Sequence, residues 1–177
     1  MTPTEEFLMW IGTCITAWAK VEEQLFGICE HCLGARTDRA AIVYYRTPTI
    51  DSRVLLVDEL VRTVLPKREK KSGSHDHPDL QEWDKLRKDL VGLLRTRGRI
   101  AHHPVAAKND FGIPGGIGLL QAKTWFEIYI SDAERLRARS EDVQPLNQDD
   151  LVSHCRDVHA IATRAANFLR ATLPRHL

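Results

Sequence analysis

The sequence predicts a mainly α-helical protein, an up-and-down helical bundle that carries a small β-hairpin insertion. Apolar residues recur at steps of three and four along several long segments, and this is the period of an amphipathic helix. Glycine or proline follows most of these segments, as is common where helices end. Residues 105–131 instead combine glycine-rich turns with aromatic and β-branched residues, which favour strands. Helices that each carry one apolar stripe must bury those stripes against one another.

A long first helix is expected over residues 4–33. Thr4 is its expected N-cap, and Gly34 is its expected stop. The apolar stripe of this helix comprises Phe7, Ile11, Cys14, Ile15, Trp18, Val21, Leu25, Ile28, Cys29 and Cys32. Trp18, like Trp83 further along the chain, is predicted to anchor the core rather than to stack on a base.

Two further helices are expected before a hydrophilic segment. The first extends from Asp38 to Arg46, and the second covers residues 49–65, with Pro66 as its terminator. Residues 66–78 then lack aliphatic and aromatic side chains and are rich in lysine. We therefore expect this segment to form a flexible basic loop, more typical of a solvated linker than of a phosphate-binding segment.

The fourth helix carries the most informative feature of the sequence. Asp79 is its expected N-cap, and its apolar stripe comprises Leu80, Trp83, Leu86, Leu90 and Leu94. Three residues further on, the same stripe reaches Arg97, so a charged side chain must either extend to solvent or lie in a cleft. Pro104 disfavours helical torsions at His103, so the helix is expected to end near His102.

The remaining chain is expected to contain a loop and β insertion at residues 105–131 and a last helix over residues 147–173. The apolar stripe of the last helix comprises Leu151, Cys155, Val158, Ala162, Ala165, Leu169 and Leu173, and Pro174 is its expected terminator. With 177 residues and no internal repeat, the chain is predicted to be a single domain over residues 1–177.

Composition excludes several classes of protein. The chain has 25 Lys and Arg against 24 Asp and Glu, so it does not bind nucleic acid through bulk charge, and a polyanion site must be local. Four cysteines are too few for a secreted disulfide scaffold, which favours a reducing, cytoplasmic location. The acidic N-terminus is unlike a signal peptide, and no segment reaches the ~20 apolar residues of a membrane span.

A cluster of arginine and histidine lies at the predicted end of the fourth helix. Arg95, Arg97 and Arg99 precede His102 and His103 there. A guanidinium group binds phosphate oxygens in a bidentate manner and an imidazole titrates near neutral pH, so the set suits phosphodiester cleavage without a metal. The alternative is structural: the arginines pair with carboxylates of the bundle, and the histidines cap the last carbonyl groups.

Two segments resemble the HEPN superfamily (higher eukaryotes and prokaryotes nucleotide-binding domains). They are residues 17–25, Ala-Trp-Ala-Lys-Val-Glu-Glu-Gln-Leu, and residues 93–102, Leu-Leu-Arg-Thr-Arg-Gly-Arg-Ile-Ala-His. The order of helices is similar over most of the chain. Many members of that family carry an arginine, then a polar residue that is often asparagine, and a histidine four to six residues after the arginine. Arg97 and His102 match this pattern, and His103 also fits the spacing.

HEPN ribonucleases act without a metal, as pairs of protomers that bring their Arg and His residues together. The resemblance therefore implies a HEPN-like homodimer that binds RNA or another nucleotide and needs no cofactor. It implies a role in defence or in a toxin–antitoxin system, where an antitoxin protein is a further partner. The alternative function is a catalytically inactive nucleotide-binding or regulatory module, and a third is a protein-interaction domain in which the arginines form structural ion pairs.

Residue roles follow from the same resemblance. His102 would act as general base or acid, and Arg97 would stabilise the charge on the phosphoryl group. Arg95, Arg99 and His103 are the expected auxiliary groups around the phosphate. Glu22 of the first helix is expected to orient Arg97, although a lone helical glutamate is more often a solvated surface residue.

The residue after Arg97 departs from the family pattern. Gly98 has no side chain to replace the frequent asparagine, and glycine in a helix costs about 1 kcal/mol relative to alanine. On an ideal helix Arg97 and His102 lie about 140° apart around the axis and about 7.5 Å apart along it. They converge on one phosphate only if the helix unwinds near Gly98 or if a second protomer completes the site.

Cysteine and histidine pairs also suggest a metal site, which the predicted helices disfavour. Cys29 and Cys32 have the spacing of a zinc pair, but they lie inside a helix on its apolar stripe rather than on a tight turn. His75 and His77 lack a nearby third ligand. We therefore expect buried cysteines and no metal.

Overall fold

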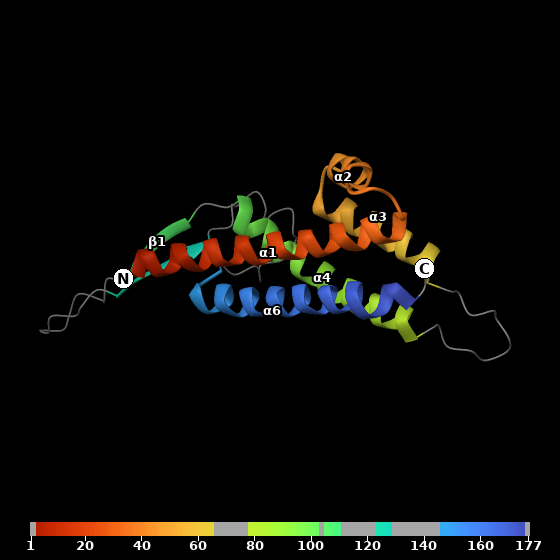
Figure 1. The fold of residues 1–177 in the computed structure, drawn as a ribbon. Coiled ribbons are helices and arrows are strands. Elements are labelled where there is room, and N and C mark those ends of the chain that lie inside the picture. The colour runs from red at the N-terminus through yellow and green to blue at the C-terminus, as the bar shows by residue number, and fades with distance from the viewer. Residues whose placement is uncertain (1–2, 66–77, 103–104, 111–122, 129–145, 176–177) are drawn as a thin grey trace, which may run out of the picture. The chain divides into compact units, whose positions relative to one another are not determined.

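The structure, a computed structural model, describes residues 3–65, 78–102, 105–110, 123–128 and 146–175. These residues are mainly helical, which confirms the prediction of a mainly α helical bundle (Figure 1). The helices are α1 (Pro3–Leu33), α2 (Thr37–Arg46), α3 (Ile50–Val64), α4 (Pro78–His102) and α6 (Gln148–Asn167). The chain divides into two compact units, Met1–Ile15 with Thr96–Arg156 and Thr16–Arg95 with Asp157–Leu177.

Two helices begin at proline rather than after the expected capping residue. Thr4 lies inside α1, which begins at Pro3, and Asp79 lies inside α4, which begins at Pro78. Proline suits the first helical turn because its ring presets φ and because an N–H there has no intrahelical partner. Pro78 is therefore helical, whereas the other residues of the loop predicted over 66–78 lie outside the described part of the chain.

Other helix ends follow the expected local chemistry. Gly34 ends α1 with φ +56°, a left-handed torsion that suits glycine, and its N–H donates to the carbonyl oxygen of His31 at 3.1 Å. Thr49 caps α3, because its hydroxyl oxygen accepts a hydrogen bond from the N–H of Ser52 at 3.1 Å.

The C-terminal helix differs from the prediction in its last turns. The α-helix ends at Asn167, and a π-helical turn (Phe168–Thr172) and a 3-10 turn (Leu173–Arg175) follow it. The wider turn lets the N–H of Leu173 donate to the carbonyl oxygen of Phe168 and buries both side chains completely. Leu169, which was expected on the buried stripe, is partly exposed instead.

The unit built from Thr16–Arg95 and Asp157–Leu177 has its core around Trp83 of α4. The Trp83 side chain is fully buried, its ring centroid lies 5.4 Å from that of Phe168, and its indole Nε1 donates to Asp58 Oδ1 at 2.8 Å. The same Asp58 oxygen accepts a hydrogen bond from Arg62 Nε at 2.9 Å and lies 3.5 Å from Arg87 Nε. The carboxylate is therefore buried together with hydrogen-bond donors and positive charge, as a buried ion requires.

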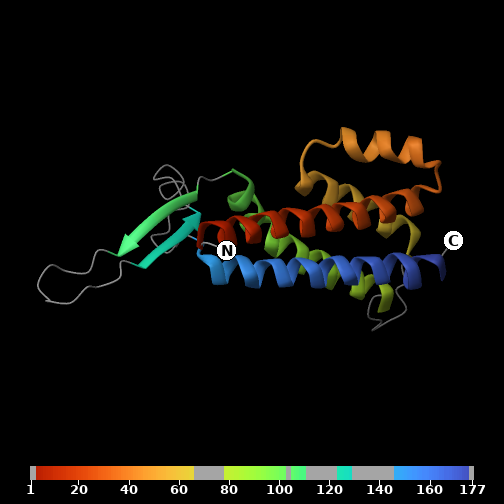
Figure 2. The ribbon, with the colours of Figure 1, turned by 60° about the vertical axis from the view of Figure 1, so that its left-hand side comes forward.

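In the same unit, α1 lies beside α6. A Cβ atom added to Gly27 would lie 2.7 Å from Cδ2 of Leu169, which belongs to the π-helical turn, so glycine leaves room for the end of that side chain. The two helices lie side by side in both views (Figures 1 and 2).

The unit built from Met1–Ile15 and Thr96–Arg156 contains the first half of α1, the first half of α6 and two strands. Cys14 Sγ donates to the carbonyl oxygen of Leu151 at 3.4 Å, and Gln148 Nε2 donates to Glu6 Oε1 at 2.8 Å. These contacts join α1 and α6 within this unit. Phe7, which is also buried, adds an aromatic ring to its core.

Strands β1 (Val105–Asp110) and β2 (Lys123–Ile128) form an antiparallel pair. Val105 is opposite Ile128, and Asp110 is opposite Lys123. The two strands lie side by side in Figure 2. The rest of the predicted insertion over 105–131, including its connecting loop, lies outside the described residues. Among the helices of the described residues, none combines the length and the apolarity that a membrane span requires.

We predict that Asp58→Ala lowers the free energy of unfolding by about 3–5 kcal/mol, because the Trp83 indole and the Arg62 guanidinium lose their shared acceptor. Asp58→Asn keeps an acceptor oxygen and should cost clearly less. Urea unfolding followed by circular dichroism measures both changes.

Asp89→Ala is the matched control for this prediction. Asp89 accepts a hydrogen bond from Arg164 Nη1 at 2.6 Å, but the side chains are 52% and 42% exposed. Because water screens this pair, its loss should cost less than about 1 kcal/mol. Equal costs for the Asp58 and Asp89 substitutions would contradict a structural role for the buried carboxylate.

Candidate functional site

The predicted catalytic residues lie at the C-terminal end of α4, which is helical without interruption from Pro78 to His102. Leu94 and Ile100 are buried on this helix, and Arg97, which lies between them in the sequence, is partly exposed. A Cβ atom added to Gly98 would meet no atom of the described residues within 4 Å.

The continuous helix determines which of the predicted residues come together. Because α4 does not unwind at Gly98, the backbones of Arg97 and His102 remain about 140° apart around the axis and about 7.5 Å apart along it. Arg99 and His102 are three residues apart and therefore occupy one side of the helix. The sequence left two ways to bring Arg97 and His102 to one phosphate: a helix that unwinds near Gly98, or a second protomer. The described helix does not unwind there.

The structure describes only some of the other residues of the cluster. Arg95 is exposed on α4, and Arg99 is partly exposed. The backbone of His102 forms the last residue of α4, whereas His103 lies outside the described residues. The choice between the two histidines therefore stays a prediction from the family spacing.

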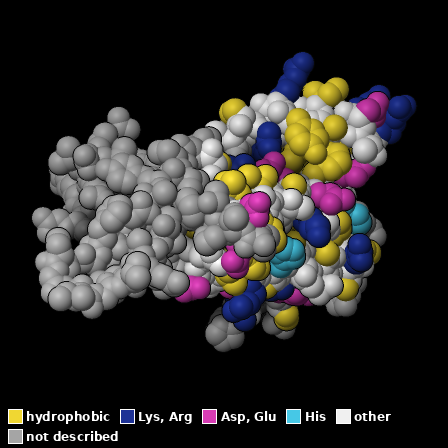
Figure 3. Space-filling view, turned by 90° about the vertical axis from the view of Figure 1, so that its left-hand side faces the viewer, with side chains coloured by type: hydrophobic (Ala, Val, Ile, Leu, Met, Phe, Trp, Pro, Cys, Tyr) yellow, Lys and Arg dark blue, Asp and Glu magenta, His cyan; other side chains and the backbone are white. Residues whose placement is uncertain are grey.

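Charges of both signs are interspersed on the described part of the face shown in Figure 3. This distribution agrees with the formal net charge of +1. It supports the inference that any polyanion site is a local set of arginines rather than a whole basic face.

Glu22 has a partner in α3 that the sequence did not predict. Arg53 Nη1 donates to Glu22 Oε2 at 2.7 Å, and the two side chains are only 17% and 23% exposed. Arg53 Nε also donates to the carbonyl oxygen of Thr47 at 3.0 Å, so two hydrogen bonds hold the guanidinium in place. Arg53 lies 31 residues after Glu22 in the sequence, and no periodic signal connects residues at that separation.

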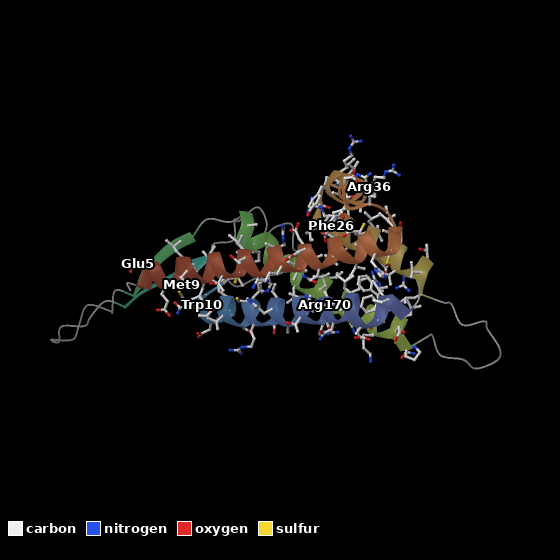
Figure 4. All side chains as sticks on the ribbon, in the orientation of Figure 1. Glu5, Met9, Trp10, Phe26, Arg36 and Arg170 are labelled. Carbon is white, nitrogen blue, oxygen red and sulfur yellow. The ribbon has the colours of Figure 1, made fainter. Side chains whose placement is uncertain are left out.

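Aromatic rings surround the Arg53 guanidinium. Its Cζ lies 5.3 Å from the ring centroid of Tyr44 and 5.6 Å from that of Tyr45, distances typical of cation–π contacts. Phe26 of α1 packs against both tyrosines, with centroid distances of 5.6 and 5.5 Å. Figure 4 shows Phe26 on the side of α1 that faces α2. These residues tie α1, α2 and α3 together beside Glu22.

Tyr44 is the buried member of this aromatic group. Its hydroxyl donates to the carbonyl oxygen of Glu22 at 3.2 Å. Burial raises the pKa of Tyr44, the Glu22 carboxylate raises it further, and the nearby Arg53 guanidinium partly lowers it. Tyr44 is therefore a neutral hydrogen-bond donor at physiological pH.

The cysteines have the environment of core residues. Cys14, Cys29 and Cys155 are buried, and Cys32 is partly exposed. Burial raises the pKa of Cys32 to about 12, with a further contribution from Cys29, so both the burial and the high pKa oppose a zinc thiolate at this pair. Within the described ranges, no group of three or more His, Cys, Asp or Glu side chains is arranged to hold a metal; His75 and His77 lie outside them.

No protein-family model, curated protein or solved structure matches this chain. Functional inference therefore depends on the residues themselves and on their resemblance to the HEPN pattern.

We predict that the stability of the protein falls as the pH rises above the ordinary thiol pKa. Burial and then the neighbouring Cys155 raise the pKa of Cys14 to about 12 in the folded protein, whereas the unfolded thiol has a pKa of about 8.5. Above that value the unfolded state loses its proton first, so each further pH unit removes about 1.4 kcal/mol for this group until the folded pKa is reached.

Urea unfolding at several pH values between neutral and strongly alkaline measures this dependence, and Cys14→Ala is the comparison variant. The wild type should lose about 1 kcal/mol more than the variant between roughly pH 8 and pH 9.5. Parallel pH profiles would show that Cys14 titrates normally in the folded state.

Proposed function

We propose that this chain is a HEPN-like RNA-binding protein that cleaves RNA without a metal, as a homodimer in a defence or toxin–antitoxin system. The observation that carries the proposal is the run Arg95, Arg97 and Arg99 in the last turns of α4, directly before His102. The helix holds these positions at fixed intervals, and a Cβ atom added to Gly98 would meet no atom of the described residues within 4 Å.

The residue types suit transesterification of RNA. The ribose 2′-oxygen attacks the adjacent phosphorus, the bond to the 5′-oxygen breaks, and a 2′,3′-cyclic phosphate and a free 5′-hydroxyl result. A histidine such as His102 accepts the proton of the 2′-hydroxyl or donates one to the leaving 5′-oxygen. Arg97 stabilises the negative charge that builds up on the phosphoryl oxygens, and Arg95 and Arg99 bind neighbouring phosphates.

A second protomer supplies the geometry that one α4 lacks. Because the helix is continuous through Gly98, Arg97 and His102 of one chain diverge around its axis. In a two-fold dimer, Arg97 of one protomer and His102 of the partner subunit meet across the interface, and the reciprocal pair forms a second site. The homodimer is thus part of the proposed mechanism.

Gly98 favours one alternative function. In an inactive HEPN-like relative that binds nucleotides or regulates a partner protein, the residue after the arginine no longer needs an amide side chain. Glycine at this position agrees with such a loss. The two functions differ in whether purified protein cleaves RNA.

We expect wild-type protein to cleave a mixed RNA pool in the presence of EDTA. Arg97→Ala and His102→Ala should each lower the rate at least about 100-fold, the usual contribution of a general acid or base or of a charge-stabilising group. Arg156→Ala, which removes an exposed arginine of α6, is the control and should cleave at the wild-type rate. Folded protein that cleaves no RNA would favour the regulatory module, and undiminished cleavage by both variants would refute the site.

We also expect Gly98→Asn to increase cleavage by about 2- to 10-fold, because one amide hydrogen bond is worth about 0.5–1.5 kcal/mol. A Cβ atom at this position meets no atom of the described residues within 4 Å. Gly98→Ala controls for helix stiffening: it should raise the free energy of unfolding by about 1 kcal/mol without increasing cleavage. Equal rate gains in both variants would attribute the effect to the backbone.

A further inference from the structure

The outward face of α2 is exposed although it is rich in apolar side chains. Ile42, Val43 and Tyr45 are 56%, 43% and 56% exposed, and Arg39 and Arg46 are exposed as well. The inner face of the same helix packs against the protein, since Ala40 and Tyr44 are completely buried. Helices of monomeric proteins usually turn such apolar residues inward, so the outward face is a candidate interaction surface.

Neighbouring residues hold the exposed Tyr45 ring in a defined position. Its centroid lies 5.5 Å from that of Phe26 and 5.1 Å from that of Tyr44, which is perpendicular to it. The Arg53 guanidinium lies 5.6 Å away and is itself fixed by Glu22 and Thr47. The Tyr45 residue as a whole is nevertheless 56% exposed, so it offers a positioned aromatic side chain at little entropic cost.

Two positive charges, Arg39 and Arg46, lie on the exposed part of α2, about 100–120° around the helix axis from Tyr45. Arg36 pairs with Asp38 at 3.2 Å, whereas Arg39 and Arg46 make no ion pair with any described residue. They are seven residues apart on α2, so they lie on one side of the helix at a separation of about 10 Å. Figure 3 shows exposed hydrophobic side chains with Lys or Arg side chains nearby at the end of the molecule where α2 lies.

The charge pattern selects the kind of partner. In a two-fold contact between antiparallel α2 helices centred between Ile42 and Val43, Arg39 would lie opposite Arg46 of the partner subunit, and like charges repel there. A polyanion instead neutralises both arginines. Single-stranded nucleic acid also provides flat bases that stack on aromatic side chains, and such stacking requires no particular sequence.

We propose that α2 forms a second RNA contact, separate from the residues at the end of α4, in which a base of single-stranded RNA stacks on Tyr45 while Arg39 and Arg46 bind its phosphates. The choice of RNA as the ligand rests on the proposed function. The placement of the contact rests on the exposed, fixed ring and on the two arginines. This surface would hold single-stranded substrate during cleavage elsewhere on the protein.

Fluorescence anisotropy with a short, labelled, single-stranded 2′-O-methyl RNA tests this contact. The methylated 2′-oxygen has no proton and cannot attack the phosphorus, so the probe reports binding without cleavage. Tyr45→Ala should weaken binding about 5- to 100-fold, the effect of losing one base–aromatic stack, and Tyr45→Trp should preserve it. Arg39→Gln and Arg46→Gln should each reduce the slope of log affinity against log salt by about 0.7.

Two further variants separate stacking from other effects. Tyr45→Leu keeps an apolar side chain against Phe26 but has no ring, so it should bind as weakly as Tyr45→Ala. Leu55→Ala removes a side chain of α3 that is 55% exposed and should bind as the wild type does. Circular dichroism confirms that each variant is folded.

The outcomes distinguish this inference from the proposed nuclease. Wild-type affinity in Tyr45→Ala and Tyr45→Leu, or no binding of the probe by the wild type, would overturn the α2 contact, whether or not the protein cleaves RNA. Binding that depends on Tyr45 in a protein that cleaves no RNA would support the contact and refute only the nuclease. A polyglutamate peptide that binds with dependence on Arg39 and Arg46 but not on Tyr45 would instead identify an acidic protein segment as the ligand.

Discussion

The hydrogen bond between the Trp83 indole and the buried Asp58 carboxylate organises one of the two compact units. It joins α4 to α3, while the Trp83 ring packs against Phe168 at the end of α6. A carboxylate is costly to bury, so the indole and the Arg62 guanidinium must stay in place around it. This requirement fixes how α4 rotates about its own axis within the unit, because Trp83 has to face Asp58.

The C-terminal end of α4 from Thr96 onwards belongs to the other compact unit and carries Arg97, Arg99 and His102. Trp83, Leu86, Leu90 and Leu94 are buried at the expected intervals, and the helix continues to His102 without a break. Because the helix is continuous there, the backbones of Arg97 and His102 lie about 140° apart around its axis, and the proposed function therefore joins them across two protomers. The backbones of Arg99 and His102 lie on one side of the same helix.

Much of the fold was predictable because its signals are local. The 3.6-residue period located the five described helices, and Gly34, with its left-handed torsion, marked the end of α1. The expected bounds differ from the observed ones by one or two residues, except at the C-terminus. There a π-helical turn buries Phe168 in place of Leu169, and an ideal period does not predict such a widened turn.

The candidate sites were predictable only in part. The arginines of α4 and His102 are close together in the sequence, so their spacing suggested phosphate chemistry. The pairing of Glu22 with Arg53 joins helices that are distant in the sequence, and only the packing of α1 against α3 reveals it. The exposure of Tyr45 was equally hidden, because the sequence does not show which of two adjacent tyrosines faces the core.

Mixing two inactive variants tests the central claim, that two protomers complete one catalytic site. Arg97→Ala and His102→Ala proteins are mixed, allowed to exchange subunits, and assayed for RNA cleavage in EDTA. Half of the dimers should then be mixed, and each mixed dimer has one intact Arg97–His102 pair across its interface, so about a quarter of the wild-type rate should return. A mixture as inactive as its components, with subunit exchange verified by labelled protomers, would contradict the shared site.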